Sequence, residues 1–179
     1  MFYFQLWTFP KESAFDPDLQ VPASPVRRSV TFWGIICCTG LLFFIQVDGN
    51  MTGDKYIDIL SEHLLPLLED TGLKETFLFQ QDNAPWHTSG AVNEFLVDSE
   101  MKVFHWPAYS PDLNIIENLW KYVKHYVREK SPTNFQAMID FAFEAWNSDS
   151  LAEICSSLYD TFIHRLDETI SFLGARIDY

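Results

Sequence analysis

The feature that most constrains the fold is an uncharged run of 18 residues, Val30 to Val47, which follows Arg27 and Arg28. By its length and its basic flank, VTFWGIICCTGLLFFIQV resembles a short membrane span. The alternative is a pair of buried strands, SVTFWGIICC and LLFFIQVDG, that turn at Thr39-Gly40. The enrichment in Val, Ile, Phe and Trp, with a Thr-Gly pair inside the run, favours the strand hairpin.

The charge balance limits how such a chain deals with nucleic acid. A length of 179 residues suits one domain with a full core, and 47% apolar with 16% aromatic residues argues against disorder. There are 25 acidic and 12 basic residues, so the formal charge is −13. This is the wrong sign for a free-standing nucleic-acid binder. An acidic protein handles DNA when divalent cations or a separate basic module supply positive charge.

The three cysteines, Cys37, Cys38 and Cys155, show no zinc-ligand spacing, and their odd number argues against a disulfide framework. This pattern fits a reducing setting inside the cell. The amino terminus, MFYFQLWTFP, lacks the basic start and the small-residue cleavage site of a signal peptide. We therefore expect neither a signal peptide nor a membrane span.

Apolar periodicity and turn signals predict strands first, then alternating strands and helices. FYFQLWTF is expected to be a strand, followed by a Pro-rich loop, DPDLQVPASP. The predicted helices occupy residues 50–72, 88–100, 112–128, 133–147 and 151–173. The first is expected to end at Gly72, and Pro66 either kinks it or begins its last part. Short strands are predicted at 76–81 and 101–107. This order predicts an α/β or α+β fold with a mixed sheet.

The stretch FLFQQDNAPWHTS places an acid at the end of an apolar run. Leu78 and Phe79 are expected to be buried in a strand, and Asp82 follows where that strand ends. Ligands of α/β sheets usually bind at the carboxyl ends of the strands. The alternative is a plain turn, because Asp, Asn and Pro are common turn residues. A partner carboxylate elsewhere in the chain would favour chemistry.

Glu117 is the candidate partner. On a wheel of the helix Asp112–Arg128, at about 100° per residue, Glu117 lies about 80° from the centre of the apolar stripe. A carboxylate at this edge is held rigidly and can reach a cleft. The alternative is a surface ion pair with Lys121, worth about 0.3–0.5 kcal/mol. Converging carboxylates suit Mg²⁺, and two such ions about 4 Å apart promote phosphodiester cleavage.

QQDNAPWHTS and WPAYSPDLNIIENLWKYVK together resemble the catalytic core of the Tc-one/mariner transposases, members of the DDE group with a ribonuclease-H-like fold. The family pattern reads Gln-Asp-Asn-Ala-Pro-x-His, then Trp-Pro-x-x-Ser-Pro-Asp-Leu-Asn-Pro-Ile-Glu-Asn-Leu-Trp. Its second and third acids correspond to Asp82 and Glu117, with 34 residues between them as in the Tc-one branch. The resemblance covers about residues 30–179 and argues against a membrane span.

The resemblance implies a ribonuclease-H-like α/β fold with a mixed central sheet, flanking helices and additional carboxyl-terminal helices. It divides the chain into a degenerate segment, 1–29, and a catalytic domain, 30–179. It also implies Mg²⁺- or Mn²⁺-dependent DNA cleavage and strand transfer in the nucleus, with Asp82 and Glu117 as catalytic metal ligands and a homodimer as the assembly. Candidates for orienting these acids or contacting DNA, which are alternatively capping or surface residues, are Asn83, His87, Asn118, Lys121 and Lys124.

The chain departs from the family pattern in three ways. The family's first aspartate stands in Phe-Ser-Asp-Glu-Ser-x-Phe, and the best match, FPKESAF, has Lys11 at that position. A cation there competes with metal, so we expect an incomplete two-ion site. Ile115 replaces a family proline, which a helix tolerates. No helix-turn-helix module precedes residue 30, so the chain resembles a truncated copy.

These departures predict weak metal binding and little or no transposition. Asp16 and Asp18 are poor substitutes for the first acid because they lie in a Pro-rich loop. The alternative function is that of a non-catalytic, domesticated interaction module.

Overall fold

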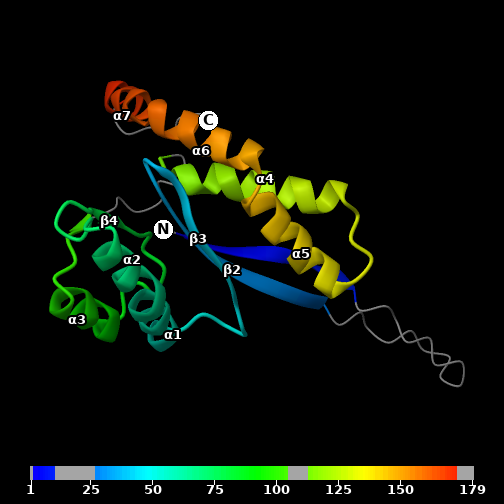
Figure 1. Ribbon diagram of the computed structural model, residues 1–179, viewed down its shortest axis with the longest axis horizontal. Helices are drawn as coiled ribbons and strands as arrows, with labels where there is room; N and C mark the ends of the chain where they lie inside the picture. Colours follow the sequence, from blue (N-terminus) through cyan, green and yellow to red (C-terminus); the bar gives the residue numbers. More distant parts are fainter. Residues whose placement is uncertain (1, 11–26, 105–112, 173–179) are drawn as a thin grey trace, which may run out of the picture. The chain divides into compact units, whose positions relative to one another are not determined.

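The computed structural model describes residues 2–10, 27–104 and 113–172 (Figure 1). The chain divides into two compact units. Unit 1 takes in Met1–Phe2, Asn50–Glu117 and Leu158–Tyr179, and unit 2 takes in Tyr3–Gly49 and Asn118–Ser157. Lys11, Asp16, Asp18 and the predicted Pro-rich loop lie outside the described residues, so the lysine at the position of the first acid remains an observation about sequence alone.

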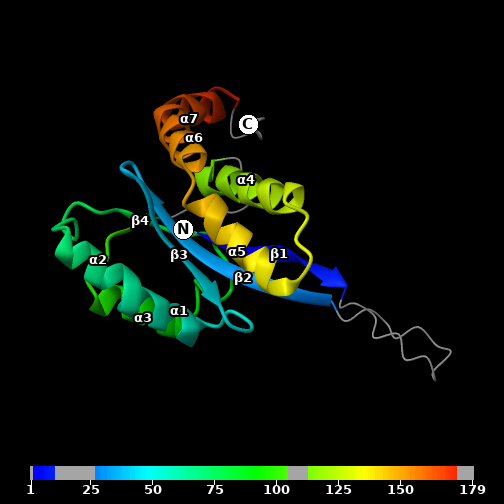
Figure 2. The ribbon, with the colours of Figure 1, turned by 45° about the vertical axis from the view of Figure 1, so that its right-hand side comes forward.

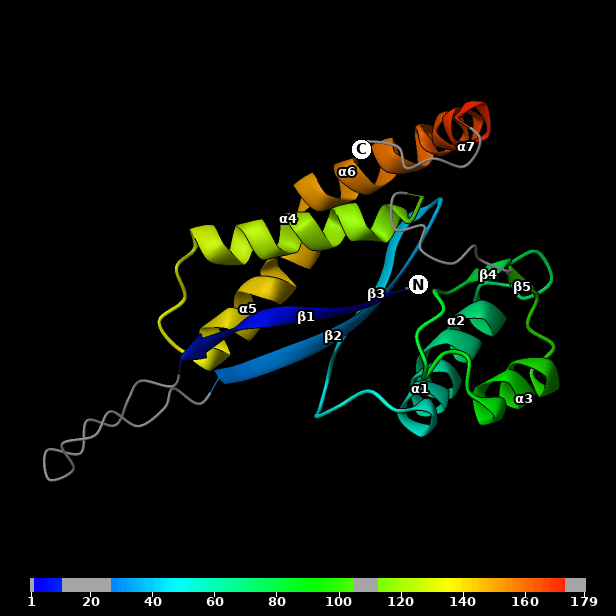
Figure 3. The ribbon, with the colours of Figure 1, turned by 180° about the vertical axis from the view of Figure 1, so that it is seen from behind.

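The uncharged run forms the predicted hairpin in unit 2. Strand β2 (Arg27–Cys37) pairs antiparallel with β3 (Gly40–Val47), from Thr31 opposite Val47 to Cys37 opposite Gly40. Gly40 has a φ of +122°, which favours glycine at this end of the turn. Strand β1 (Phe2–Pro10) completes a sheet in the order β1-β2-β3, visible in Figure 3. Among the described residues, no helix is long and apolar enough to cross a membrane.

Aromatic side chains form the core of unit 2, between this sheet and helices α4 (Ile115–Glu129) and α5 (Phe135–Trp146). Both helices lie along the same face of the hairpin (Figures 1 and 3). Phe44 stacks on Phe32, with ring centroids 4.7 Å apart, and on Trp146 at 4.6 Å. Trp120 is 1% exposed and stacks on Trp146 at 5.2 Å. Trp120 is therefore part of the core of unit 2.

The predicted helix is confirmed in unit 1, where it has three parts and Pro66 lies at the start of the last one, as one of the two alternatives for this proline predicted. The three parts are α1 (Gly53–Ile59), a π-helical turn (Leu60–Leu64) and α2 (Leu65–Asp70). Pro66 has no N–H and cannot donate to the carbonyl four residues earlier, so the ladder loses a bond there. Just before it, the Leu65 N–H bonds to the Leu60 carbonyl in the wider π spacing. Gly72, with a φ of +67°, follows the last turn.

A short parallel pair and a third helix complete the part of unit 1 that bears the acid. Strand β4 (Phe79–Gln80) pairs with β5 (Val103–Phe104). Strand β4 is shorter than predicted, and β5 begins two residues later than predicted, while residues 105–107 lie outside the described residues. Leu78 was predicted to be buried but is 57% exposed, because only Phe79 turns inward at the start of so short a strand. Helix α3 (Gly90–Asp98), capped by Ser89, lies beside α1 (Figures 1 and 2). Antiparallel and parallel pairing both occur, in two separate sets of described strands.

The carboxyl-terminal half is helical, with two corrections to the predicted bounds. Helix α4 begins at Ile115 rather than at Asp112. The single helix predicted at 151–173 is two helices, α6 (Asp149–Asp160) and α7 (Phe162–Ser171). The break between the two helices lies at Thr161. Its hydroxyl donates to the Leu158 carbonyl at 3.2 Å, and such a side-chain bond competes with the backbone hydrogen bonds of a helix.

Cys155 is expected to resist alkylation in the folded protein. Its side chain is fully buried, and this burial, assisted by Cys37, raises its pKa to about 11. Thiolates are the reactive species, so iodoacetamide at pH 8 should label exposed Cys38 and spare Cys155 until urea is added. Mass spectrometry of tryptic peptides measures both. Equal labelling of the two cysteines in the native protein would show that this part of α6 opens readily.

Candidate active site

Asp82 lies two residues after strand β4, at the carboxyl end of the parallel pair. The preceding residue, Gln81, is 7% exposed, whereas the Asp82 side chain is 42% exposed. Along the chain, a buried polar side chain is thus followed directly by a carboxylate that is accessible to solvent. This is the position predicted for Asp82 from the sequence.

The chain turns tightly after Asp82, and this turn brings His87 into contact with the Asp82 carboxylate. The backbone N–H of Ala84 donates to Asp82 Oδ1 at 3.0 Å, and the His87 N–H donates to the Ala84 carbonyl at 2.9 Å. His87 Nδ1 then lies 2.6 Å from Asp82 Oδ1. The stretch is therefore a turn, as the plain alternative proposed, and it also holds the acid. The other oxygen, Oδ2, has no hydrogen-bond partner among the residues that the structure describes.

The contacts of Asp82 favour its ionised form. Burial works against ionisation, but the hydrogen bonds from His87 and from the Ala84 N–H outweigh it and lower the pKa of Asp82. An ionised carboxylate only accepts hydrogen bonds, so His87 Nδ1 carries the proton and donates it. Because His87 and the Ala84 N–H both bond to Oδ1, Oδ2 is the oxygen of Asp82 that is open to a ligand.

Behind His87 lies a buried polar network that reaches helix α1. The Tyr56 hydroxyl donates to Gln81 Oε1 at 2.8 Å, and Gln81 Nε2 donates to the His87 carbonyl at 3.1 Å. The rings of Tyr56 and His87 pack with centroids 4.3 Å apart. Burial, and next the charge of Asp82, raise the pKa of Tyr56 well above its usual value, so its hydroxyl remains a donor.

The approach of α1 to this turn depends on a small residue. A Cβ on Gly53 would lie 2.7 Å from Ser89 Oγ, the oxygen that caps α3. Glycine at the start of α1 therefore lets its first turn come close to the start of α3. Tyr56, one turn further along α1, is then in reach of both Gln81 and His87.

Glu117 lies in the first turn of α4 and is half-buried, with its N–H donating to the carbonyl of buried Asn114 at 3.0 Å. It belongs to unit 1, as Asp82 does. Ile115 takes the first helical position, where proline is also well suited, so its replacement of the family proline is compatible with the helix. The roles of Asp82 and Glu117 as catalytic metal ligands stay predictions.

The remaining candidates are spread over both units. Asn83 is exposed beside Asp82 in unit 1, and His87 is the candidate that contacts the acid. Asn118 and Lys124 are half-buried and Lys121 is exposed on the part of α4 that belongs to unit 2. Their proposed contacts with DNA stay predictions.

The donor set fits a divalent ion only in part. Mg²⁺ takes oxygen ligands and is commonly held by one or two carboxylates with several waters. Asp82 offers an ionised carboxylate with one open oxygen, which suits such an ion. Within residues 27–104 and 113–172, however, no group of three or more His, Cys, Asp or Glu side chains is arranged to hold a metal. The described residues therefore suit one weakly held, largely hydrated ion.

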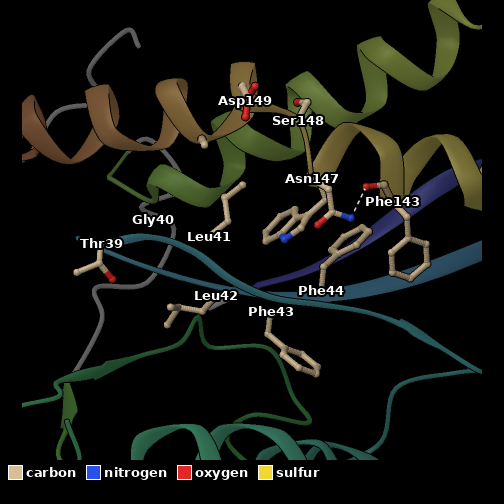
Figure 4. Close-up of a pocket in the computed structure, with 12 residues that line it drawn as sticks. Thr39, Gly40, Leu41, Leu42, Phe43, Phe44, Phe143, Asn147, Ser148 and Asp149 are labelled. Carbon is tan, nitrogen blue, oxygen red and sulfur yellow. Dashed lines mark hydrogen bonds between the residues drawn. The ribbon is translucent and has the colours of Figure 1, made fainter. Parts of the chain in front are cut away.

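A hollow of about 420 Å³ lies in unit 2, between β3 and the junction of α5 with α6 (Figure 4). Apolar side chains such as Leu41 and Phe143 line it, and Asn147 beside it donates to the Phe143 carbonyl at 2.9 Å. Asp149 is the acid among its lining residues. A single exposed acid offers no basis for acid–base or metal chemistry, so we assign the hollow no reaction.

Comparison with known proteins places the chain in a family. A model of the DDE superfamily endonucleases matches residues 9–139. The chain belongs to this family. The Tcb2 transposable-element transposase of Caenorhabditis briggsae is 31% identical over 168 residues, covering 92% of this chain and 60% of that protein. The chain thus spans about 60% of the length of that relative, and the resemblance to Tc-one transposases is confirmed.

Solved structures show the fold of this chain. The crystal structure of the catalytic domain of Mos1 mariner transposase matches 98% of this chain and 82% of that domain, with a TM-score of 0.75 at 17% identity. The Mos1 mariner paired-end complex with Mn matches 98% of this chain and 56% of its own, with a TM-score of 0.68 at 18% identity. The predicted ribonuclease-H-like fold is confirmed. The division of the chain at residue 29 stays a prediction.

Sequence reasoning missed two members of the network around Asp82. Tyr56 lies in the apolar stripe of its helix, where an aromatic residue is usually part of the core. Gln81 gave a weak signal, because it is a polar residue directly after an apolar strand. A buried amide must find partners, and Tyr56 and His87 supply them.

Proposed function

We propose that this chain is a transposase catalytic domain of impaired activity, whose reaction is metal-dependent cleavage and transfer of DNA strands. The observation that carries the proposal is the geometry of Asp82. One oxygen of this acid is fixed by His87 and the Ala84 N–H, and the other is open at the end of a strand. A rigid, ionised carboxylate of this kind suits a ligand for a divalent cation.

Asp82 and Glu117 are the residues that would hold Mg²⁺ or Mn²⁺. When bound, such an ion supplies positive charge that favours deprotonation of water and stabilises the leaving oxygen. The role of His87 is to keep Asp82 ionised and to fix the direction in which its open oxygen points. The ion would also offset part of the formal charge of −13 where the DNA phosphates approach.

The proposed reaction has two displacements at phosphorus. First, a water oxygen bonds to a phosphorus of the transposon end while the bond from that phosphorus to a 3′ oxygen breaks, which frees a 3′-hydroxyl. That hydroxyl then bonds to a phosphorus of the target strand while a 3′ oxygen of the target leaves. Each step exchanges one phosphorus–oxygen bond for another, so neither step needs an oxidant or a nucleophilic side chain.

We attribute the impairment to Lys11, which stands where the family pattern has its first aspartate. An ammonium group there repels a divalent ion and removes a ligand. The absence of a three-donor cluster in the described part of the chain supports weak metal binding. We further propose DNA as the partner, a homodimer as the assembly and the nucleus as the location, in keeping with the transposase relatives.

Replacing Lys11 by aspartate is expected to increase Mn²⁺-dependent nicking of supercoiled plasmid by at least about tenfold over the wild type, because it restores a metal ligand. Adding Asp82→Asn should abolish the gain. Lys74→Asp, at a lysine with a 3.8 Å surface contact to Glu69, makes the same charge change and should leave nicking unchanged. Strong nicking by the wild-type chain that disappears in Asp82→Asn would mean that another acid supplies the first ligand.

The alternative is a non-catalytic, domesticated module that keeps the fold for interaction with other molecules. The incomplete donor set of the described residues favours it over a fully active enzyme. A Lys11→Asp protein that is folded, as judged by its unfolding transition, and still fails to nick DNA would support this alternative.

A further inference from the structure

We propose that Tyr56 and Gln81 are positioning residues for Asp82, and that they act by holding His87 in place. The inference rests on the proposed function of Asp82 as a metal ligand. Its structural basis is the chain of contacts from Tyr56 through Gln81 to His87 and from His87 to Asp82. All four residues belong to unit 1.

The first step is the selection of one carboxylate oxygen. His87 Nδ1 and the Ala84 N–H both donate to Oδ1 of Asp82, at 2.6 Å and 3.0 Å. Two donors on one oxygen fix the torsion of the carboxylate, because rotation would break both bonds. The open oxygen then has one direction in which to meet a cation. If the His87 ring turned, this selection would be lost.

The second step is the orientation of the His87 ring. The ring is fully buried, and its Nε2 has no hydrogen-bond partner within the part of the chain that the structure describes. Nothing on that side therefore fixes the rotation of the ring. The ring is held by its bond to Asp82 and by packing against Tyr56, 4.3 Å away, and Trp86, 6.0 Å away.

The third step is the placement of the His87 backbone by Gln81. The Gln81 amide accepts from the Tyr56 hydroxyl and donates to the His87 carbonyl. The His87 carbonyl can only accept a hydrogen bond, so it requires the Nε2 end of the amide and leaves Oε1 to accept from the Tyr56 hydroxyl. The Tyr56 hydroxyl holds the other end of the amide, so the Gln81 side chain is fixed at both ends and keeps the turn carrying His87 in place.

Two conservative variants of the full chain test the proposal, with Mn²⁺ as the probe. Tyr56→Phe keeps the ring and removes the hydroxyl, and Gln81→Met keeps the approximate volume and removes the amide. Each is expected to weaken Mn²⁺ binding, followed by electron paramagnetic resonance, by about tenfold, as for residues that orient metal ligands. Tyr126→Phe is the matched control, because it removes a 2.6 Å phenol hydrogen bond to Glu144 in unit 2. It should leave Mn²⁺ binding unchanged.

A second readout, independent of metal, is the Nδ1–H resonance of His87 in long-range ¹H–¹⁵N spectra. We expect it to shift or broaden in Tyr56→Phe and Gln81→Met and to keep its wild-type position in Tyr126→Phe. A resonance unchanged in both variants overturns the positioning role. If Asp82→Asn binds Mn²⁺ as tightly as the wild type, the proposed metal site fails instead, and the resonance alone decides the role of Tyr56 and Gln81.

Discussion

Replacing Gly34 by alanine is expected to lower the free energy of unfolding by about 3 kcal/mol, the upper end of the usual cost of overpacking. Gly34 lies in β2, and a Cβ there would lie 2.6 Å from Cη2 of Trp120 and 2.9 Å from Cη2 of Trp146. Neither separation is compatible with ordinary packing, so at least one indole must move.

The indoles have little room to move. Trp120 and Trp146 are 1% and 4% exposed, and they stack on each other with centroids 5.2 Å apart. Trp146 also stacks on Phe44, at 4.6 Å. A shift of either ring therefore disturbs several aromatic contacts in a close-packed core. Because small domains are stable by only about 5–15 kcal/mol, this one methyl group is expected to cost a large share of the total.

Urea unfolding followed by tryptophan fluorescence measures the change. Gly90→Ala is the matched control, because a Cβ at that position meets nothing within 4 Å and Gly90 begins helix α3. We expect Gly90→Ala to keep or slightly raise the stability, by up to about 1 kcal/mol. A loss below about 1 kcal/mol in Gly34→Ala would mean that the indoles repack easily, contrary to the usual cost of core overpacking.

Replacing His87 by alanine is expected to lower the free energy of unfolding by about 3 kcal/mol, since it leaves a buried cavity and removes a hydrogen bond to a charged group. His87 is fully buried, packs on Tyr56 and donates to Asp82 at 2.6 Å. The variant also frees the Asp82 carboxylate to rotate. Mn²⁺ binding should therefore weaken together with stability, which calorimetry and a Mn²⁺ titration measure on the same sample.

A double-mutant cycle with Asp82→Ala separates packing from the hydrogen bond. The cavity cost remains when Asp82 is replaced, whereas the bond can be lost only once, so the two changes are expected to be non-additive by about 1–2 kcal/mol. Strict additivity would show that the 2.6 Å contact contributes little to stability. In that case the contribution of His87 to stability would come mainly from the packing of its buried ring.

Local signals predicted much of the fold correctly. The hairpin followed from β-branched and aromatic residues on both sides of Thr39-Gly40, and Gly40 adopts the positive φ that such a turn needs. Helices α3 and α5 fall inside their predicted ranges. The break at Thr161 was missed because apolar spacing continues through it, while the deciding bond is a side-chain hydroxyl to the Leu158 carbonyl. Leu78 was misjudged because strand β4 has only two residues.

The candidate site was predicted in part. The position of Asp82 after a strand and the turn residues that follow it are local properties, and both could be read from the chain. The contact between His87 and Asp82 depends on how tightly that turn closes, which residue types alone do not specify. The Tyr56 hydroxyl reaches Gln81 across 25 residues of sequence, so no local pattern pointed to this pair.

Sequence by itself determined the family of this chain and the positions of its candidate acids, because motif residues and their spacing are properties of the linear chain. Only the tertiary structure decided which oxygen of Asp82 is held, how His87 is oriented and why Gly34 must be small. These are matters of distance between side chains from separate elements, and such distances exist only once the elements have packed.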